Sequence, residues 1–555
     1  MRINTTQNLT SWFVALIVIL ALPIGCSTEY YKEDADKEVY QIIDEKWHDD
    51  FGVKANFRIS DVEPGPEDIN FDPNDLYTPT GAISLKEAVR IATAKSRQYQ
   101  QQKESLYSTA LSLSMSRHNY EPKLRGIFGG SYSRNASNES VSGDTSFSVS
   151  QLLADGASMS VSVASDWFRY LTGDPSQSLG SVLSATVSQP LLQGAGRKIA
   201  QEGLTQAERS MIYQLRSFAR YRKTFVVNII SQYYRVLQAI DNVENAQRNL
   251  TNLIDDENRQ RMMVEAERIT MLNFAQVEQS RLRGEDNLRQ AEQNYKQTLD
   301  NFKILLGIPI ETPLELDRDE LPRLRQAGIS NTIYDPNDAI AVALTHRLDF
   351  LTIQDQLIDS ERQVMLAQDN LRISLDLTAS ARANSTPETQ LTRFMFHEGS
   401  YSVGFDTDLL LDRKSQRNSY RSAVISLTRT KRNYEEEIDR IKLDIRDALR
   451  QLERTAVSYE LQERSLVVAT QRAESSRMML TYNQATPRDV VEATESELQA
   501  LNSTTAALID HTIAKLEFFR DIGVLQVNND GFWYQDFFSE TGEPADDQPK
   551  LENKQ

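Results

Sequence analysis

The stretch "SMSVSVAS", residues 158–165, alternates small hydroxyl side chains with apolar ones. Successive side chains of a β-strand point to opposite faces of the sheet. The stretch therefore predicts a strand with one apolar face and one hydroxyl face. Most of the surrounding sequence has the pattern of very long helices, so the fold must give this strand something apolar to lie against.

Three further stretches alternate in the same way: "VLSATVSQP" (182–190), "SLDLTASARA" (374–383) and "YSVGFDTD" (401–408). Such dyads, about ten residues long, are typical of membrane β-barrels, although one-sided soluble sheets carry them too. A sheet must bury its apolar face, and the neighbouring helices offer only narrow apolar seams. A bilayer would cover that face, and Trp167, Phe168 and Tyr170 add aromatic flanks. One chain has too few strands for an aqueous channel, so we expect several chains to share one barrel.

The helical segments predict two long hairpins, over about 197–265 with 270–306 and about 413–483 with 488–522. No proline interrupts 191–308, and neither proline nor glycine occurs from 405 to 486. Apolar residues of the second stretch recur every three or four positions, which is typical of a coiled-coil seam. A soluble coiled coil is the simplest interpretation of that seam, but it leaves the strands unexplained.

Composition narrows the function classes. The net charge of −18 argues against nucleic-acid binding. The five histidines are scattered, so we expect no metal site. "GAGRK" (194–198) lacks the spacing of a phosphate-binding loop, and no GxSxG motif occurs. We therefore expect neither an enzyme nor a cofactor.

The N-terminus has the form of an export signal. The apolar run "WFVALIVILAL" (12–22) is followed by "PIGC", which ends at the single cysteine, Cys26. This resembles a bacterial lipoprotein signal, in which the cysteine is lipidated. An ordinary cleaved signal with an incidental cysteine is the alternative. Both interpretations send the protein out of the cytoplasm.

Two parts of the sequence look alike. "ISLKEAVRIA" (83–92) and "DPNDAIAVAL" (335–344) both begin a short helix. The Arg-Lys pairs at 197–198 and 413–414 are 216 residues apart, as are Gly307 and Gly523. Two separate matches with the same offset along the chain indicate an internal duplication.

The chain is identified as similar to the TolC-like outer-membrane efflux proteins (outer membrane factors) of the lipoprotein type. The motifs are "ISLKEAVRIA", "SQPLLQGAGR", "NFKILLGIP" and "YNQATPRDVVEA", in that order over about 80–525. The resemblance implies a mainly α fold with a transmembrane β-barrel: a trimeric 12-stranded barrel continuous with a long α-helical barrel, each chain an internal duplication. It also implies a bacterial outer-membrane location, with a tunnel in the periplasm and an acylated (palmitate-bearing) Cys26.

The expected organisation begins with a signal peptide (1–25) and a periplasmic arm (26–80). The first repeat (81–330) would hold strands within about 124–190 and a hairpin over about 197–306. The second repeat (331–525) would hold strands over about 373–410 and a hairpin over about 413–522, and an acidic tail (526–555) would follow. The implied partners are two more copies of the chain, a periplasmic adaptor (membrane fusion protein), an inner-membrane pump of the RND, ABC or a similar type, and outer-membrane lipid.

The resemblance places the periplasmic aperture at the hairpin tips. Asp489 and Glu492 match the family's inward acidic residues, and a spacing of three puts them on one helix face. In a trimer they would form acidic rings that favour cations; two solvated surface acids are the alternative. Candidates for adaptor docking at the two tips are Glu265, Arg268, Met271, Ala485, Pro487 and Arg488.

The first repeat contains four strand candidates where the family has two. We keep the family's four strands per chain and expect the surplus to form an outer hairpin, because six per chain would give eighteen, a wider barrel than a twelve-helix tunnel matches easily. The expected function is the passive exit duct of a tripartite efflux or type I secretion system. Alternatives are a protein-secretion duct of the same fold and a lipid-anchored periplasmic coiled-coil scaffold without a pore.

Overall fold

The computed structural model describes residues 27–54, 57–59, 82–135, 138–171, 177–329, 334–385, 393–409, 411–482, 484–528 and 531–534. The signal segment, Cys26 and most of the acidic tail lie outside these residues. The chain divides into two compact units. The sheet unit comprises Met1–Trp47, Leu106–Gln214 and Asp359–Ser426, and the hairpin unit comprises His48–Ser105, Leu215–Ile358 and Leu427–Gln555. Each unit contains parts of both sequence repeats, so the two repeats stay a prediction about the chain's organisation.

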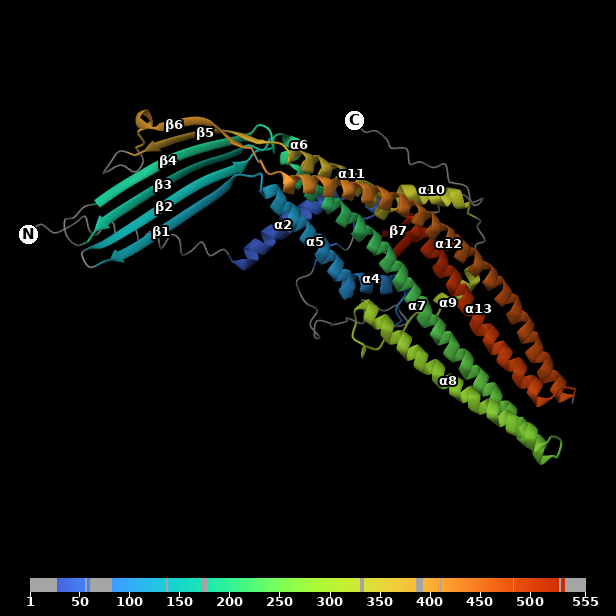
Figure 1. Ribbon diagram of the computed structural model, residues 1–555. Coiled ribbons are helices and arrows are strands. Elements are labelled where there is room, and N and C mark those ends of the chain that lie inside the picture. Colours follow the sequence, from blue (N-terminus) through green and yellow to red (C-terminus); the bar gives the residue numbers. More distant parts are fainter. Residues whose placement is uncertain are drawn as a thin grey trace, which may run out of the picture. The chain divides into compact units, whose positions relative to one another are not determined.

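The sheet unit contains one antiparallel sheet, with its strands in the order β1-β2-β3-β4-β5-β6 (Figure 1). Their bounds are β1 Lys123–Arg134, β2 Glu139–Leu152, β3 Ser158–Tyr170, β4 Gln177–Pro190, β5 Ser374–Asn384 and β6 Ser400–Asp408. The expectation of four sheet strands with a separate outer hairpin is wrong for this chain. The first two strands continue the same sheet, because β2 pairs with β3 from Ser140 to Leu152.

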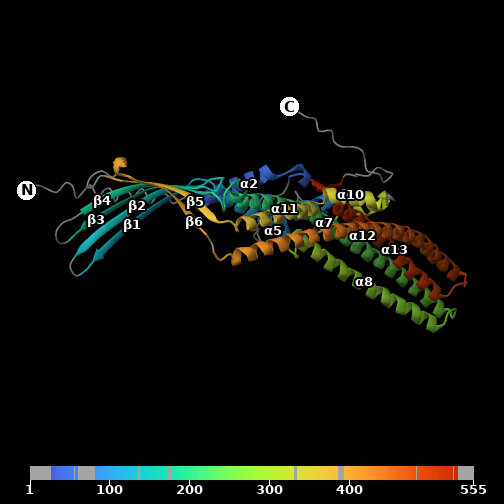
Figure 2. The same ribbon diagram turned by 45° about the horizontal axis from the view of Figure 1, so that its top comes forward.

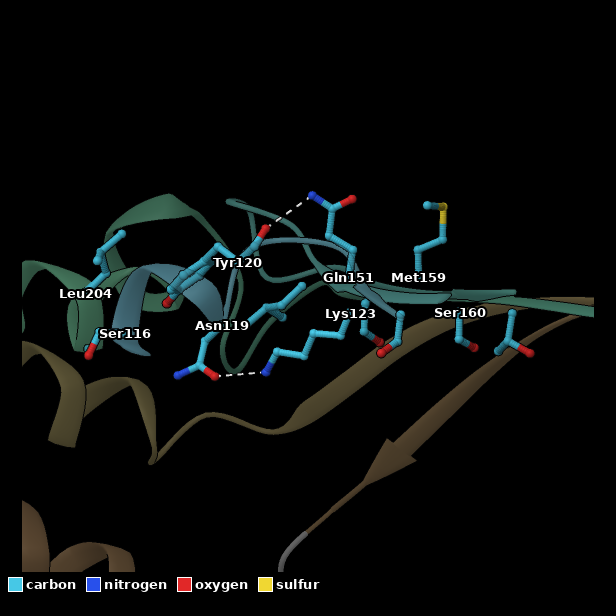
Figure 3. A pocket seen from close by; sticks show the side chains of 13 residues that line it. Ser116, Asn119, Tyr120, Lys123, Gln151, Met159, Ser160 and Leu204 are labelled. Atoms are coloured by element: carbon cyan, nitrogen blue, oxygen red, sulfur yellow. Dashed lines mark hydrogen bonds between the residues drawn. The ribbon is translucent and has the colours of Figure 1, made fainter. Parts of the chain in front are cut away.

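At one level of the sheet, the alternation predicted for residues 158–165 continues across all six strands. Paired residues of neighbouring strands lie on the same face. One row across the six strands is apolar throughout: Leu124, Val149, Val161, Ala185, Ala381 and Tyr401. The adjacent row, on the other face, carries a lysine and five hydroxyl groups: Lys123, Ser150, Ser160, Thr186, Ser380 and Ser402. In the close-up of Figure 3, Met159 and Ser160 point to opposite sides of their strand.

Local contacts fix the register of the sheet. The tight turn "ADGA" (154–157) joins β2 to β3, with Gly156 at φ +95° and the Leu153 amide donating to the Ala157 carbonyl at 2.7 Å. On the hydroxyl face, Ser380 and Ser402 are hydrogen-bonded at 2.7 Å. A one-residue slip would place every apolar side chain on the wrong face.

Four long helices and the short α6 lead into or out of the sheet. α5 (Arg97–His118) leads into β1, and α11 (Leu348–Asp369) leads into β5. The short α6 (Arg197–Ala200) and α7 (Glu202–Glu265) follow β4, and α12 (Lys414–Thr481) follows β6.

The N-terminal arm is partly helical, which the sequence did not lead us to expect. α2 spans Thr28–Lys46, and the Ser27 side chain caps its first turn. Lys46 forms an ion pair with Glu208 of α7 at 2.6 Å, and Arg117 of α5 contacts the same carboxylate at 2.9 Å. Within the arm, glycine and proline occur only from Gly52 onward, so neither interrupts this helix.

The hairpin unit contains the remaining helices and a small two-stranded sheet. Their bounds are α4 Leu85–Lys95, α8 Met271–Leu306, α9 Glu320–Ala327, α10 Pro336–His346, α13 Pro487–Asp521, β7 Leu525–Asn528 and β8 Gly531–Tyr534; short 3₁₀ turns occupy Asp49–Phe51 here and Phe396–Glu398 in the sheet unit. Short helices begin at both predicted positions: a capping box of Ser84 and Glu87 starts α4. The Asp335 side chain caps α10, with Pro336 at the first helical position.

Two glycines end the returning helices in similar surroundings. Gly307 follows α8 with φ +77°, against the carbonyl of Lys95 at the end of α4. Gly523 follows α13 with φ +88°, against the carbonyl of His346 at the end of α10. These are the two glycines that share the sequence offset. Phe302, Phe518 and Tyr233, all fully buried, belong to the core of this unit.

Candidate functional site

The turns of the two hairpins lie at the same end of the hairpin unit in both views (Figures 1 and 2). The hairpins are joined along their length by polar contacts. Asp241 of α7 accepts a hydrogen bond from Thr505 of α13 at 2.8 Å, and Arg235 forms an ion pair with Asp510 at 2.6 Å. Nearer the turns, Arg283 of α8 and Glu495 of α13 are 3.9 Å apart.

Asp489 caps the helix that returns from the second tip. Thr486 is the N-cap residue, and the buried Pro487 occupies the first helical position. The Asp489 carboxylate accepts hydrogen bonds from the Thr486 amide at 2.8 Å and the Thr486 hydroxyl at 2.7 Å. The bond from the Thr486 backbone lowers the pKa of Asp489. The carboxylate is therefore exposed, ionised and held in a fixed position.

Glu492 lies one turn further along α13 and pairs with the preceding helix. Its carboxylate is 2.9 Å from a guanidinium nitrogen of Arg472 on α12, and both side chains are more than half exposed. Further along, Glu497 pairs with Arg477 at 3.5 Å. These pairs tie the two helices of the second tip together. Each acid of the predicted ring therefore already has a partner within its own chain.

The first tip is built differently. α7 ends at Glu265, and the amide of Arg268 donates to the Met263 carbonyl at 2.9 Å. Glu267 has φ +55°, a left-handed conformation that usually belongs to glycine. The Thr270 side chain then caps α8, which begins at Met271. Glu265, Arg268 and Met271 are all exposed, so this tip offers a surface with no acid at the position matching Asp489.

Exposed apolar side chains gather at both tips, which the sequence analysis missed. They are Met262, Met271 and Leu272 at the first tip and Met478, Met479 and Tyr482 at the second. Met271 is 68% exposed and Tyr482 is 73% exposed. At the second tip, Ala485 is half-buried and Arg488 is exposed. The sequence signal is a methionine pair, "MM" at 262–263 and again at 478–479, near the end of each helix.

A hydroxyl-lined pocket of about 560 Å³ lies where the sheet meets its helices (Figure 3). Lys123 donates to the Asn119 side chain at 2.9 Å, and Gln151 donates to the Tyr120 carbonyl at 3.2 Å. Among the described residues, no group of His, Cys, Asp or Glu side chains could hold a metal ion. No helix in the same residues is long and apolar enough to cross a membrane.

Comparison with known proteins identifies the fold. No family model and no curated protein matches the sequence. Among solved structures, the chain is similar to CusC, described as forming a transmembrane channel (TM-score 0.59, 13% identity, covering 79% of this chain and 92% of CusC). It is also similar to the CmeC outer membrane channel of Campylobacter jejuni (TM-score 0.57, 14% identity, 81% and 86% covered). A third is the MtrE outer membrane channel of Neisseria gonorrhoeae (TM-score 0.58, 13% identity, 79% and 88% covered).

The fold is thus that of bacterial outer-membrane channels. Within that class it is the fold of the TolC-like proteins, as the sequence motifs predicted.

Proposed function

We propose that three copies of this chain form a passive exit duct in the bacterial outer membrane. A shared β-barrel would cross the membrane, and an α-helical tunnel would cross the periplasm. The observation that carries this proposal is the sheet, with an apolar row on one face and a hydroxyl row on the other across every strand. Lipid would cover the first face and water the second, and closure would remove the sheet edges that lipid does not tolerate.

The proposed duct and a scaffold without a pore predict different behaviour in a bilayer. A lipid-anchored periplasmic coiled-coil scaffold would use the same long helices without a pore. Purified protein should be reconstituted in planar bilayers, with its fold checked by circular dichroism. Stepwise single-channel conductance supports the duct, and a silent bilayer with folded protein supports the scaffold. A duct for secreted proteins shares the fold, and is distinguished by which pump gene lies beside this one.

The duct would receive its substrates from partners. We propose a periplasmic adaptor and an inner-membrane pump, in an efflux or type I secretion system, with the pump supplying the energy. The exposed methionines and Tyr482 support the two tips as the adaptor surface, because methionine side chains pack adaptably against partner helices. The chain itself would do no chemistry. The paired glycines 307 and 523, each closing on an earlier helix, support the internal duplication.

Asp489 and Glu492 would line the periplasmic aperture. Asp489 is exposed and kept ionised by its cap, and Glu492 is exposed beside it. Three copies would place six carboxylates around one axis, which favours cations. Replacing both (Asp489→Asn with Glu492→Gln) should raise single-channel conductance and weaken block by multivalent cations. Asparagine keeps a capping side chain at 489.

Glu460→Gln is the matched control for this experiment. Glu460 is an exposed acid of α12, paired only to Arg464 on its own helix at 2.6 Å, and it lies away from the turn. Glu460→Gln removes one exposed acid and its ion pair with an arginine, as Glu492→Gln does, without changing the tip. If the double variant and the control give the same conductance and cation block as the unchanged protein, the two acids do not form the constriction.

A further inference from the structure

The first two strands of the sheet have the character of a barrel wall. In β1, Leu124, Phe128 and Tyr132 lie on the apolar face, and Leu124 is 83% exposed in the single chain. Phe128 packs edge-to-face against Phe147 of β2, with ring centroids 5.4 Å apart. An outer hairpin in water would leave these side chains solvated. Lipid would cover them together with the apolar faces of β3 to β6.

We propose that all six strands of each chain lie in the membrane wall, so that three copies close an eighteen-stranded barrel. This inference rests on the proposed trimeric channel. It adds which strand of the adjacent copy pairs with each edge strand of the sheet. β1 of one copy would pair with β6 of the next copy. β1 runs away from the helices and β6 runs back towards them, so the new pair is antiparallel, like every other pair in the sheet.

The charges on the two edge strands are complementary. Lys123 and Arg125 begin β1 on the hydroxyl face, and Asp406 and Asp408 end β6 on the same face. Both sets lie at the helical end of the sheet, so pairing between copies brings lysine and arginine opposite two aspartates. Cross-strand pairs of opposite charge stabilise a sheet. If β1 and β2 lay outside the wall, the edge facing β6 would be β3, which begins with serines at 158, 160 and 162.

The circumference of the eighteen-stranded wall also fits the helices. Eighteen strands about 4.8 Å apart and tilted by about 40° make a wall roughly 110 Å around, whereas twelve give roughly 75 Å. Four helices per chain join the sheet, α5, α7, α11 and α12, which gives twelve in three copies. Helices packed about 8–10 Å apart then make a ring of about 95–120 Å. On these spacings, eighteen strands match a ring of twelve helices better than twelve strands do.

A wall of eighteen strands leaves an open lumen. Barrel diameter grows roughly linearly with strand number, so the lumen would be about 1.5 times as wide as that of twelve strands, and barrels of 16–18 strands hold aqueous channels. Lysine, arginine and hydroxyl groups would line it near the helices. The barrel would then admit larger cargo than the tips, so selection by size would fall to the tips.

Cross-linking between copies tests the edge assignment. The charge pairing sets Lys123 of β1 opposite Asp408 of β6 in the next copy, and Ser158 begins β3 at the same end of the sheet. Two double variants are compared in membranes with a short bis-maleimide: Lys123→Cys with Asp408→Cys, and Ser158→Cys with Asp408→Cys. The single variants control for Cys26. We expect covalent dimers and trimers from the first pair and no more than the single-variant background from the second.

The outcomes separate this inference from the proposed function. Cross-linking of the second pair instead of the first, or of neither pair in a protein that is trimeric by native mass spectrometry, overturns the eighteen-stranded wall and leaves the duct standing. A monomer in that measurement overturns both. Counting the strands of the unmodified, detergent-solubilised trimer by electron cryomicroscopy gives an independent readout: eighteen supports the inference and twelve refutes it.

Discussion

Gly307 ends α8 at a point where a side chain has no room. Its φ of +77° is left-handed, and its amide donates to the Ile304 carbonyl at 3.1 Å. A Cβ placed on it would lie 2.3 Å from the carbonyl oxygen of Lys95 and 2.9 Å from Cα of Ser96. These are backbone atoms, which cannot rotate away as a flexible side chain could. Gly307→Ala must therefore move the end of α4 or unwind the end of α8.

The free-energy cost of Gly307→Ala is the sum of three effects. A left-handed alanine costs about 1–2 kcal/mol. Forcing an extra carbon against packed backbone costs about 1–3 kcal/mol more. Alanine also restricts the unfolded chain, which returns about 0.4–1 kcal/mol. We expect a net destabilisation on the order of 2–4 kcal/mol.

Two other glycines separate these effects. Gly328 has φ +64° and nothing within 4 Å of an added Cβ, so Gly328→Ala isolates the left-handed cost. Gly203 lies inside α7 with the same free space, so Gly203→Ala should stabilise the helix by about 0.5–1 kcal/mol. Thermal unfolding of the detergent-solubilised proteins should rank Gly203→Ala highest, then Gly328→Ala, then Gly307→Ala. If Gly307→Ala and Gly328→Ala unfold at the same temperature, the close approach to Lys95 is not what restricts this position.

Three further predictions follow from other parts of the chain. Gly523→Ala should destabilise about as strongly as Gly307→Ala in the same assay, because an added Cβ would lie 2.8 Å from the His346 carbonyl oxygen at φ +88°; an unfolding temperature equal to that of the unchanged protein would contradict this. Burial lowers the pKa of Lys223 to about 8 from 10.5, so the unfolded state binds more protons between these values and the stability of the folded state rises with pH across that window. The unfolding temperature of Lys223→Met should lack this rise, which amounts to about 3 kcal/mol for a pKa change from 10.5 to about 8, and parallel pH profiles would refute the assignment. Cys26→Ser should remove the N-terminal acyl groups, which mass spectrometry of the mature N-terminus reads directly; an unmodified N-terminus in the unchanged protein would show that Cys26 is not the anchor.

The sequence predicted the individual strands of this fold but not how distant strands pair with each other. The period-two stretches predicted the strands, because alternation is written into consecutive residues. Strand pairing is not local: that Leu124 of β1 shares a row with Tyr401 of β6 follows only from the five ladders between them. The family's strand count was therefore kept where this chain departs from it.

The hairpin tips show the same difference between local features, which the sequence predicts, and contacts between helices, which it does not. Pro487 at the start of a helix was readable from the sequence, and the capping pair of Thr486 and Asp489 was equally readable as Ser/Thr-x-x-acid. This capping pair was not predicted, because Asp489 was interpreted only as an aperture residue. The contact between Glu492 and Arg472 joins two helices across a turn, and helix periodicity alone does not say which residues face each other across it.

The two unpaired edge strands, β1 and β6, also make a single copy prone to misassembly. In a lone subunit, β1 and β6 are almost entirely exposed along their length, and unpaired strands recruit other chains into fibrils or misassembled sheets. In the proposed trimer, a single copy would be most exposed to such misassembly before its neighbours pair with β1 and β6. Closing the barrel would then protect each copy as well as form the pore.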